Sequence, residues 1–148
     1  FAKLAITADG MQISSVQRAD TEPEFHECAT ESEYIQKLTQ TARASKEFKG
    51  TTAFVALDTE TAARTAQLLG DDSPTLIGEG DTLPNSGSIL LTLPLAKGLE
   101  FDHVVIVDAN KEDFPETDLS RRRLYTAISR ATSTVSIFSN GELSPLLK

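Results

Sequence analysis

The chain has 148 residues, 39% of them apolar, and its 14 basic and 22 acidic side chains give a formal net charge of −8. This length and composition fit one globular domain with a hydrophobic core. The negative net charge argues against a domain whose whole surface binds nucleic acid, because such domains carry a basic stripe or patch.

Residues that form disulfides or bind metals are scarce. Cys28 is the one cysteine, which excludes an internal disulfide, and with only His26 and His103 besides, no metal site is expected. A lone cysteine fits a reducing, cytoplasmic setting. No apolar run approaches the roughly 20 residues needed to span a bilayer, so no membrane association is expected.

Charged residues are spread unevenly along the chain. Six acids and no Lys or Arg lie between Asp20 and Glu33, and five acids accompany Lys111 between Asp108 and Asp118. Acidic runs of this kind usually form solvated faces, which is the interpretation we adopt.

Short apolar runs rich in β-branched residues alternate with helical patterns. The runs predict buried strands at 12–16, 52–57, 75–77, 88–93, 104–107 and 134–138. Strand–helix alternation of this kind predicts an α/β fold with a mainly parallel sheet flanked by helices.

Three capping residues predict where helices begin. Thr30 and Glu33 form a capping box ahead of an apolar stripe. Asp58 predicts the start of a second helix, and Asp118 that of a third, which should run through about Ala131.

The rest of the chain connects these elements. Residues 1–7 look like the tail of a helix that began upstream. The segment 70–87, rich in Gly, Asp, Pro and Ser, reads as a short connection with one small strand. We therefore interpret residues 1–148 as a single domain.

The segment 88–138 carries the chemistry. Ligands of open α/β sheets bind beyond the carboxyl ends of strands, and the turn 97–102 is expected at such an end. There Gly98 permits an unusual backbone shape, Glu100 can accept hydroxyl protons, and Arg130 suits phosphate oxygens. These residues can together hold a nucleotide, but taken alone they favour ordinary turn and surface roles.

Two motifs resemble those of a known family. Thr92-x-x-x-x-Lys97-Gly98-Leu99-Glu100-Phe101-Asp102 resembles motif V of superfamily 1 helicases of the UvrD/Rep type. Leu-Tyr-Thr-Ala-Ile-Ser-Arg-Ala at 124–131 resembles their motif VI. The resemblance implies the second, carboxy-terminal RecA-like domain (of the P-loop NTPase type) of such a helicase, and it extends more loosely over the whole chain.

The resemblance also implies roles for individual residues. Glu100 would bind the ribose of ATP, with Gly98 letting the backbone approach. Arg130 would reach the γ-phosphate as an arginine finger and act catalytically. Thr92 would donate to a phosphate of single-stranded DNA, and Tyr125 would serve packing or coupling.

Each role has a plainer alternative. Glu100 can be a solvated turn residue, Arg130 a surface ion-pair partner, and Thr92 a β-branched strand residue. Lys97 can be structural. The trio 121–123 is interpreted as solvated arginines, although one of them can support the nucleotide site or pair with the acidic loop.

Several family features are not found in the sequence. It contains no Gly-x-x-x-x-Gly-Lys-Ser/Thr phosphate loop and no strand ending in paired Asp-Glu. In the family an upstream RecA-like domain supplies both, so ATP and Mg²⁺ would be held mainly there. The Asn-Tyr-Arg-Ser-like motif of the second domain is also not found. The chain is therefore expected to begin partway through that domain and to be inactive alone.

Two departures leave the function open. The connection 70–87 has no room for the helical subdomain that larger relatives insert. Pro94 stands two positions after the motif V threonine, where the family has a polar residue. This compactness is similar to helicase IV-like and HelD-like proteins. The chain fits an ATP-dependent DNA helicase or translocase, or the nucleotide-sensing domain of a factor that remodels RNA polymerase. A fold kept only for protein interaction is the third alternative, against which Glu100 and Arg130 count.

Overall fold

A computed structural model describes residues 22–84 and 87–148. The described strands form one six-stranded sheet in the order β1-β6-β5-β2-β4-β3, and all five strand pairings are parallel. The strands are β1 (Glu24–Cys28), β2 (Thr51–Ala56), β3 (Thr75–Leu76), β4 (Gly87–Thr92), β5 (Phe101–Ile106) and β6 (Ala131–Asn140).

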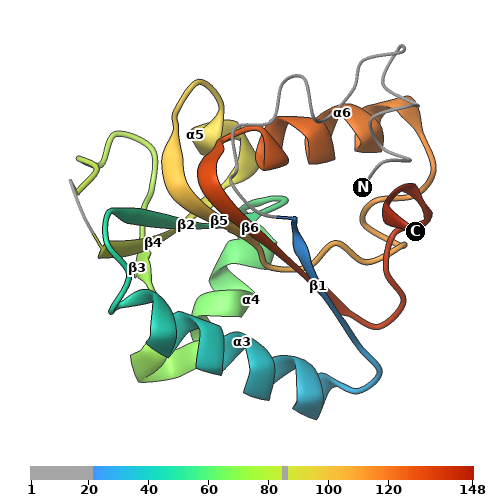
Figure 1. Ribbon diagram of the computed structural model, residues 1–148, viewed down its shortest axis with the longest axis horizontal. Coiled ribbons are helices and arrows are strands. Elements are labelled where there is room, and N and C mark those ends of the chain that lie inside the picture. The colour runs from blue at the N-terminus through green and yellow to red at the C-terminus, as the bar shows by residue number, and fades with distance from the viewer. Residues whose placement is uncertain (1–21, 85–86) are drawn as a thin grey trace.

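Helices cover both faces of this sheet (Figure 1). One face carries α3 (Glu31–Ser45) and α4 (Thr59–Leu69), and the other carries α5 (Leu93–Ala96) and α6 (Asp118–Ile128). Two short 3₁₀ helices, η1 (Gly70–Asp72) and η2 (Pro145–Leu147), complete the described elements.

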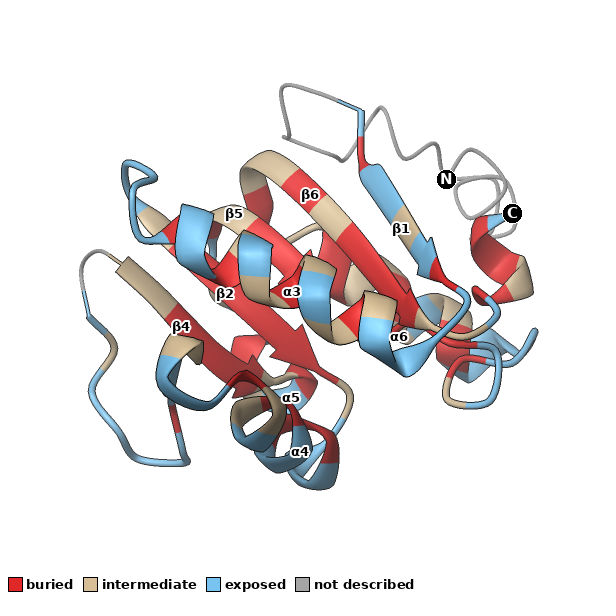
Figure 2. Cartoon of the chain, turned by 90° about the horizontal axis from the view of Figure 1, so that it is seen from below, coloured by how far each residue is buried: buried red, intermediate tan, exposed pale blue. Residues whose placement is uncertain are grey.

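The two faces of the sheet form two apolar clusters. Along β2, Ala53 and Val55 join the cluster under α5 and α6, whereas Phe54 joins the cluster under α3 and α4. Successive side chains of a strand point to opposite faces, and both faces are covered here. This is why the central strands are buried almost throughout, as Figure 2 shows in red, and why they read as continuous apolar runs.

Five predicted strands are confirmed with small shifts at their ends, whereas the predicted strand 12–16 and the helix tail 1–7 lie outside the described residues. The prediction missed β1, which lies in the acidic run 20–33. Among the described strands it lies at the edge of the sheet and pairs with β6 alone, and Glu24 and Glu27 are exposed on it. Its polar composition follows from that half-exposed position.

The helix starts are confirmed at Thr30, which accepts a hydrogen bond from Glu33 N at 3.1 Å, and at Asp58, which accepts one from Thr61 N at 2.8 Å. The third start and end were wrong by a few residues. Thr117, not Asp118, caps α6, and the helix ends at Ile128, because residue 131 already belongs to β6.

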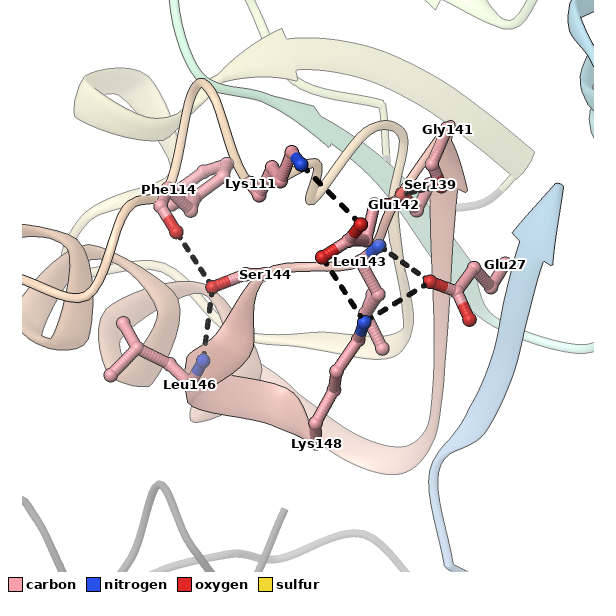
Figure 3. Close-up of polar contacts among 10 residues, drawn as sticks. All are labelled: Glu27, Lys111, Phe114, Ser139, Gly141, Glu142, Leu143, Ser144, Leu146 and Lys148. Atoms are coloured by element: carbon pink, nitrogen blue, oxygen red, sulfur yellow. Dashed lines mark hydrogen bonds and ion pairs between the residues drawn. The ribbon is translucent and has the colours of Figure 1, made fainter. Parts of the chain in front are cut away.

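The carboxy-terminal residues 141–148 form polar contacts with Glu27, Lys111 and Phe114, and we call this cluster the carboxy-terminal clasp (Figure 3). Ser144 is fully buried, donates a hydrogen bond to Phe114 O at 2.7 Å and accepts one from Leu146 N at 3.2 Å. Around it, the exposed charges pair with each other. The pairs are Lys111–Glu142 at 3.3 Å, Lys148–Glu142 at 3.5 Å and Lys148–Glu27 at 3.6 Å.

No helix within the described ranges is both long and apolar enough to cross a membrane.

Candidate functional site

The turn 97–100 lies at the amino edge of the sheet, because it follows α5 and leads directly into β5. The expectation that this turn lies beyond the carboxyl end of a strand is therefore wrong. A single turn of helix and a few residues carry the chain from the end of β4 back to the start of β5. Because β5 and β6 are parallel neighbours, residue 130, just before β6, lies beside this turn.

Arg130 is bonded to that turn. Its Nη1 donates to Leu99 O at 3.3 Å, its Nε to Thr126 O at 3.2 Å, and its Nη2 to Ser129 Oγ at 3.2 Å. Its own carbonyl accepts from Phe101 N at 2.8 Å. None of the ion pairs between described residues involves Arg130, so its charge is held by neutral acceptors only.

Gly98 shapes the turn through its backbone. Its φ of 85° lies in the left-handed region that other residues avoid. A Cβ added there would meet no atom of the described residues within 4 Å, so packing against that part of the chain does not require the glycine. Glu100, two residues on, is exposed. A close approach of a ligand to the backbone is thus possible at this turn.

A second connection fixes the start of β5, and the sequence reasoning missed it. The Asp102 carboxylate accepts a hydrogen bond from Thr51 N at 2.9 Å, which ties β5 to β2. Gly50 has φ 84°, and a Cβ there would overlap the Asp102 carboxylate. The available signal was a glycine two residues before the predicted strand 52–57, but only the fold identifies its partner.

Thr92 lies at the opposite edge of the sheet. It pairs with Ala56 at the carboxyl end of β2, whereas the start of β5 is level with the start of that strand. Five residues of strand separate the two levels, about 17 Å at roughly 3.3 Å per residue. The structure thus brings Gly98, Glu100 and Arg130 together, but not Thr92. Thr92 is the N-cap residue of α5, yet its hydroxyl makes no capping bond.

A groove of about 370 Å³ runs between α5 and α6. It is lined by Leu93, Pro94, Lys97, Leu119, Arg122, Arg123 and Thr126. The interpretation of 121–123 as a solvated trio is therefore incomplete. Arg121 pairs with Asp118 and is largely buried, whereas its two successors line the groove.

The carboxyl edge of β5 holds a buried acid. Asp108 is 7% exposed and accepts a hydrogen bond from Asn140 N at 2.9 Å. Burial raises the pKa of this carboxyl above its ordinary range, and the hydrogen bonds from Asn140 and Asn110 offset part of the rise. Next to it, the Tyr34 hydroxyl donates to Val107 O at 2.5 Å, and burial raises the pKa of that phenol.

These groups join strands and helix to one another and are structural. No group of three or more His, Cys, Asp or Glu side chains suited to a metal ion occurs among residues 22–84 and 87–148.

Comparison with known proteins is consistent with this geometry. Residues 87–138 match the family model of the UvrD-like helicase C-terminal domain. The match spans the turn at Gly98 and residue Arg130, so the resemblance noted on the two motifs is confirmed over this segment. No curated protein matches the chain at a significant level.

Among solved structures, the C-terminal domain of a possible DNA helicase from Lactobacillus plantarum WCFS1 is similar, with a TM-score of 0.77 and 25% identity. The match covers 98% of this chain and 88% of that one. The C-terminal domain of the DEAD-box protein Dbp5 shares the fold, with a TM-score of 0.55 and 14% identity over 83% of this chain and 77% of that one. The predicted RecA-like α/β fold is confirmed.

Proposed function

Since residues 87–138 match the C-terminal domain of UvrD-like helicases, we propose that the chain is the second motor domain of an ATP-dependent DNA helicase or translocase. In this proposal it completes an ATP site whose phosphate loop and Mg²⁺ ligands belong to an upstream RecA-like domain. The chain by itself hydrolyses no ATP.

The observation that carries the proposal is the bond from Arg130 Nη1 to Leu99 O at 3.3 Å. It joins the two motif segments, which are 31 residues apart, at one sheet edge. An acceptor for sugar hydroxyls and a guanidinium for phosphate oxygens thus lie beside the same turn. This donor and acceptor set fits a nucleoside triphosphate.

In the proposed complex each residue has a distinct task. Glu100 accepts hydrogen bonds from the ribose, and Gly98 lets the backbone come close. Arg130 exchanges its neutral acceptors for the γ-phosphate and stabilises the charge that develops there during transfer. Thr92, at the other sheet edge, donates to a phosphate of single-stranded DNA.

A second candidate is the nucleotide-sensing domain of a factor that binds and remodels RNA polymerase. The net charge of −8 favours it, as does the compact link between α4 and β4, which holds only η1 and β3 among the described elements. Strong salt-dependent binding to single-stranded DNA supports the first candidate. Stable co-purification with RNA polymerase, with weak DNA binding, supports the second.

The ATP assignment is tested in the protein that joins this chain to its upstream domain. Arg130→Ala is expected to lower kcat about a thousandfold while ATP still binds, because a finger acts on the developing charge. Arg43→Ala, on α3 at the other face, removes the same charge and serves as the control. Near-wild-type turnover by Arg130→Ala contradicts the assignment, and turnover by the isolated chain contradicts its dependence on an upstream domain.

A further inference from the structure

We infer that the groove between α5 and α6 binds the phosphodiester backbone of a single-stranded nucleic acid through Lys97, Arg122 and Arg123. The inference rests on the proposed function and extends it from one contact, at Thr92, to a path over the helical face. Arg122 and Arg123 lie outside both motif segments, and Lys97 lies in the first of them without an assigned ligand.

The groove concentrates positive charge in an acidic protein. Three of its seven lining residues are cations, and none is an acid, although the chain as a whole carries a net charge of −8. None of the three forms an ion pair with another described residue. A cluster of cations left without local counter-charges attracts an anionic ligand.

Both basic residues within α3, on the other helical face, are paired. On α3, Lys37 pairs with Glu33 at 3.5 Å, and Arg43 pairs with Asp72 of η1 at 3.0 Å. Arg121, beside the groove residues on α6, pairs with Asp118. Lys46, Lys49 and Arg64 also form no ion pair with a described residue, so the groove is distinguished by three such cations lining one concave surface.

One acid lies near the groove without neutralising it. Asp58, at the carboxyl end of β2, has its pKa lowered first by the hydrogen bonds from Thr61 and least by the charges of Arg64 and Arg123. Asp58 already accepts a hydrogen bond from Thr61 N at 2.8 Å as the cap of α4, and none of the ion pairs between described residues joins it to Arg123. The Arg123 guanidinium keeps its capacity for a phosphate.

The chemistry of the lining suits a polynucleotide backbone. Two guanidinium groups offer planar forks that match phosphate oxygens, and Lys97 adds a point charge. Pro94 and Leu119, which are both exposed, add apolar surface beside these charges. Sugars and bases can cover such surface while the phosphates meet the cations.

The position of the groove links the two ends of the proposed site. At one end Leu93 directly follows Thr92, the predicted DNA contact. At the other end lies Thr126, whose carbonyl accepts Arg130 Nε at 3.2 Å. A strand that touches Thr92 can therefore continue over α5 and α6 toward the residue that holds Arg130.

Binding of a fluorescent oligothymidylate to the 148-residue chain, followed by anisotropy over a range of salt concentrations, tests the inference. The double variant Arg122→Gln/Arg123→Gln is expected to bind at least about tenfold more weakly. The slope of log K against log salt should become shallower by about 1.4, or about 0.7 for each phosphate that no longer meets a guanidinium. Arg123→Lys should keep the wild-type slope, because it keeps the charge.

The matched control is Arg43→Gln/Lys46→Gln, which removes two charges from the α3 side, and it should change neither affinity nor slope. Equal effects of both double variants overturn the inference, because net charge alone would explain them. The inference is also overturned if Thr92→Val loses binding while the groove variants bind as the wild type does. That result would leave the proposed function intact. The inference is likewise overturned if ATP or polyglutamate displaces the oligothymidylate as well as unlabelled oligothymidylate does. The ligand of the groove would then be a nucleotide or an acidic protein.

Discussion

The amino edge of the sheet and the carboxy-terminal clasp are both polar, but they satisfy their charges differently. In the clasp, Lys111 and Lys148 pair with Glu142 or Glu27, and Ser144 is buried with backbone partners on both sides (Figure 3). At the amino edge, Arg130 is held by two carbonyls and a hydroxyl and by no described acid.

This difference separates structural polar groups from groups suited to ligands. A charge with a local partner gains little from a new one, and exposed pairs of this kind contribute only about 0–1 kcal/mol to stability. A guanidinium held by neutral acceptors can exchange them for a phosphate with a net gain in charge complementarity. The same distinction sets the groove cations apart from those of α3.

Gly50→Ala should give the largest loss of stability. It qualifies the comparison between the amino edge and the clasp, because it tests a structural contact that lies at the amino edge. The new Cβ would overlap the Asp102 carboxylate, and φ 84° is strained for alanine. We expect a loss of roughly 2–4 kcal/mol in the free energy of unfolding, measured by urea denaturation. In an Asp102→Ala background the same substitution should cost only about 1 kcal/mol. Equal costs in both backgrounds contradict the overlap.

Ser144→Ala should give a smaller loss in the clasp, about 1–3 kcal/mol, because it leaves Phe114 O buried without its donor. Thermal and urea unfolding measure it. Ser133→Ala is the control, since Ser133 is half-buried on β6 and makes no side-chain hydrogen bond with a described residue. Its change should stay within about 0.5 kcal/mol. A similar loss in both variants would remove the special role of Ser144.

Much of this fold could be predicted from apolar periodicity and capping residues. Central strands such as β2 are buried on both faces and read plainly as apolar runs. The strand β1 could not be read in this way, because only one described strand pairs with it and two of its exposed residues are acidic. Edge position is a property of the whole sheet and leaves no periodic signal in five residues.

The candidate site was predictable only in part. Gly98, Glu100 and Arg130 were identified through the family motifs, because spacing alone fits ordinary turns. The wrong sheet edge was assigned because α5 is too short to show in the sequence pattern. The groove cations and the Asp102–Gly50 contact depend on segments that meet only after folding.

Asp108→Asn should give the smallest effect and tests an exception, a buried acid at the carboxyl edge without an ion pair to a described cation. Burial raises its pKa above 3.8, so the folded state holds the proton to higher pH than the unfolded state. The free energy of unfolding should then fall as pH rises from 3.8 through the folded pKa. The hydrogen bonds from Asn140 and Asn110 offset part of the burial cost, which keeps this fall small.

Asparagine keeps the acceptor for Asn140 N but carries no charge. The variant should therefore lack this decline and exceed the wild type in stability at pH 7, as urea titrations at several pH values will show. Parallel curves for the two proteins would mean that the ionised carboxylate is fully compensated where it lies.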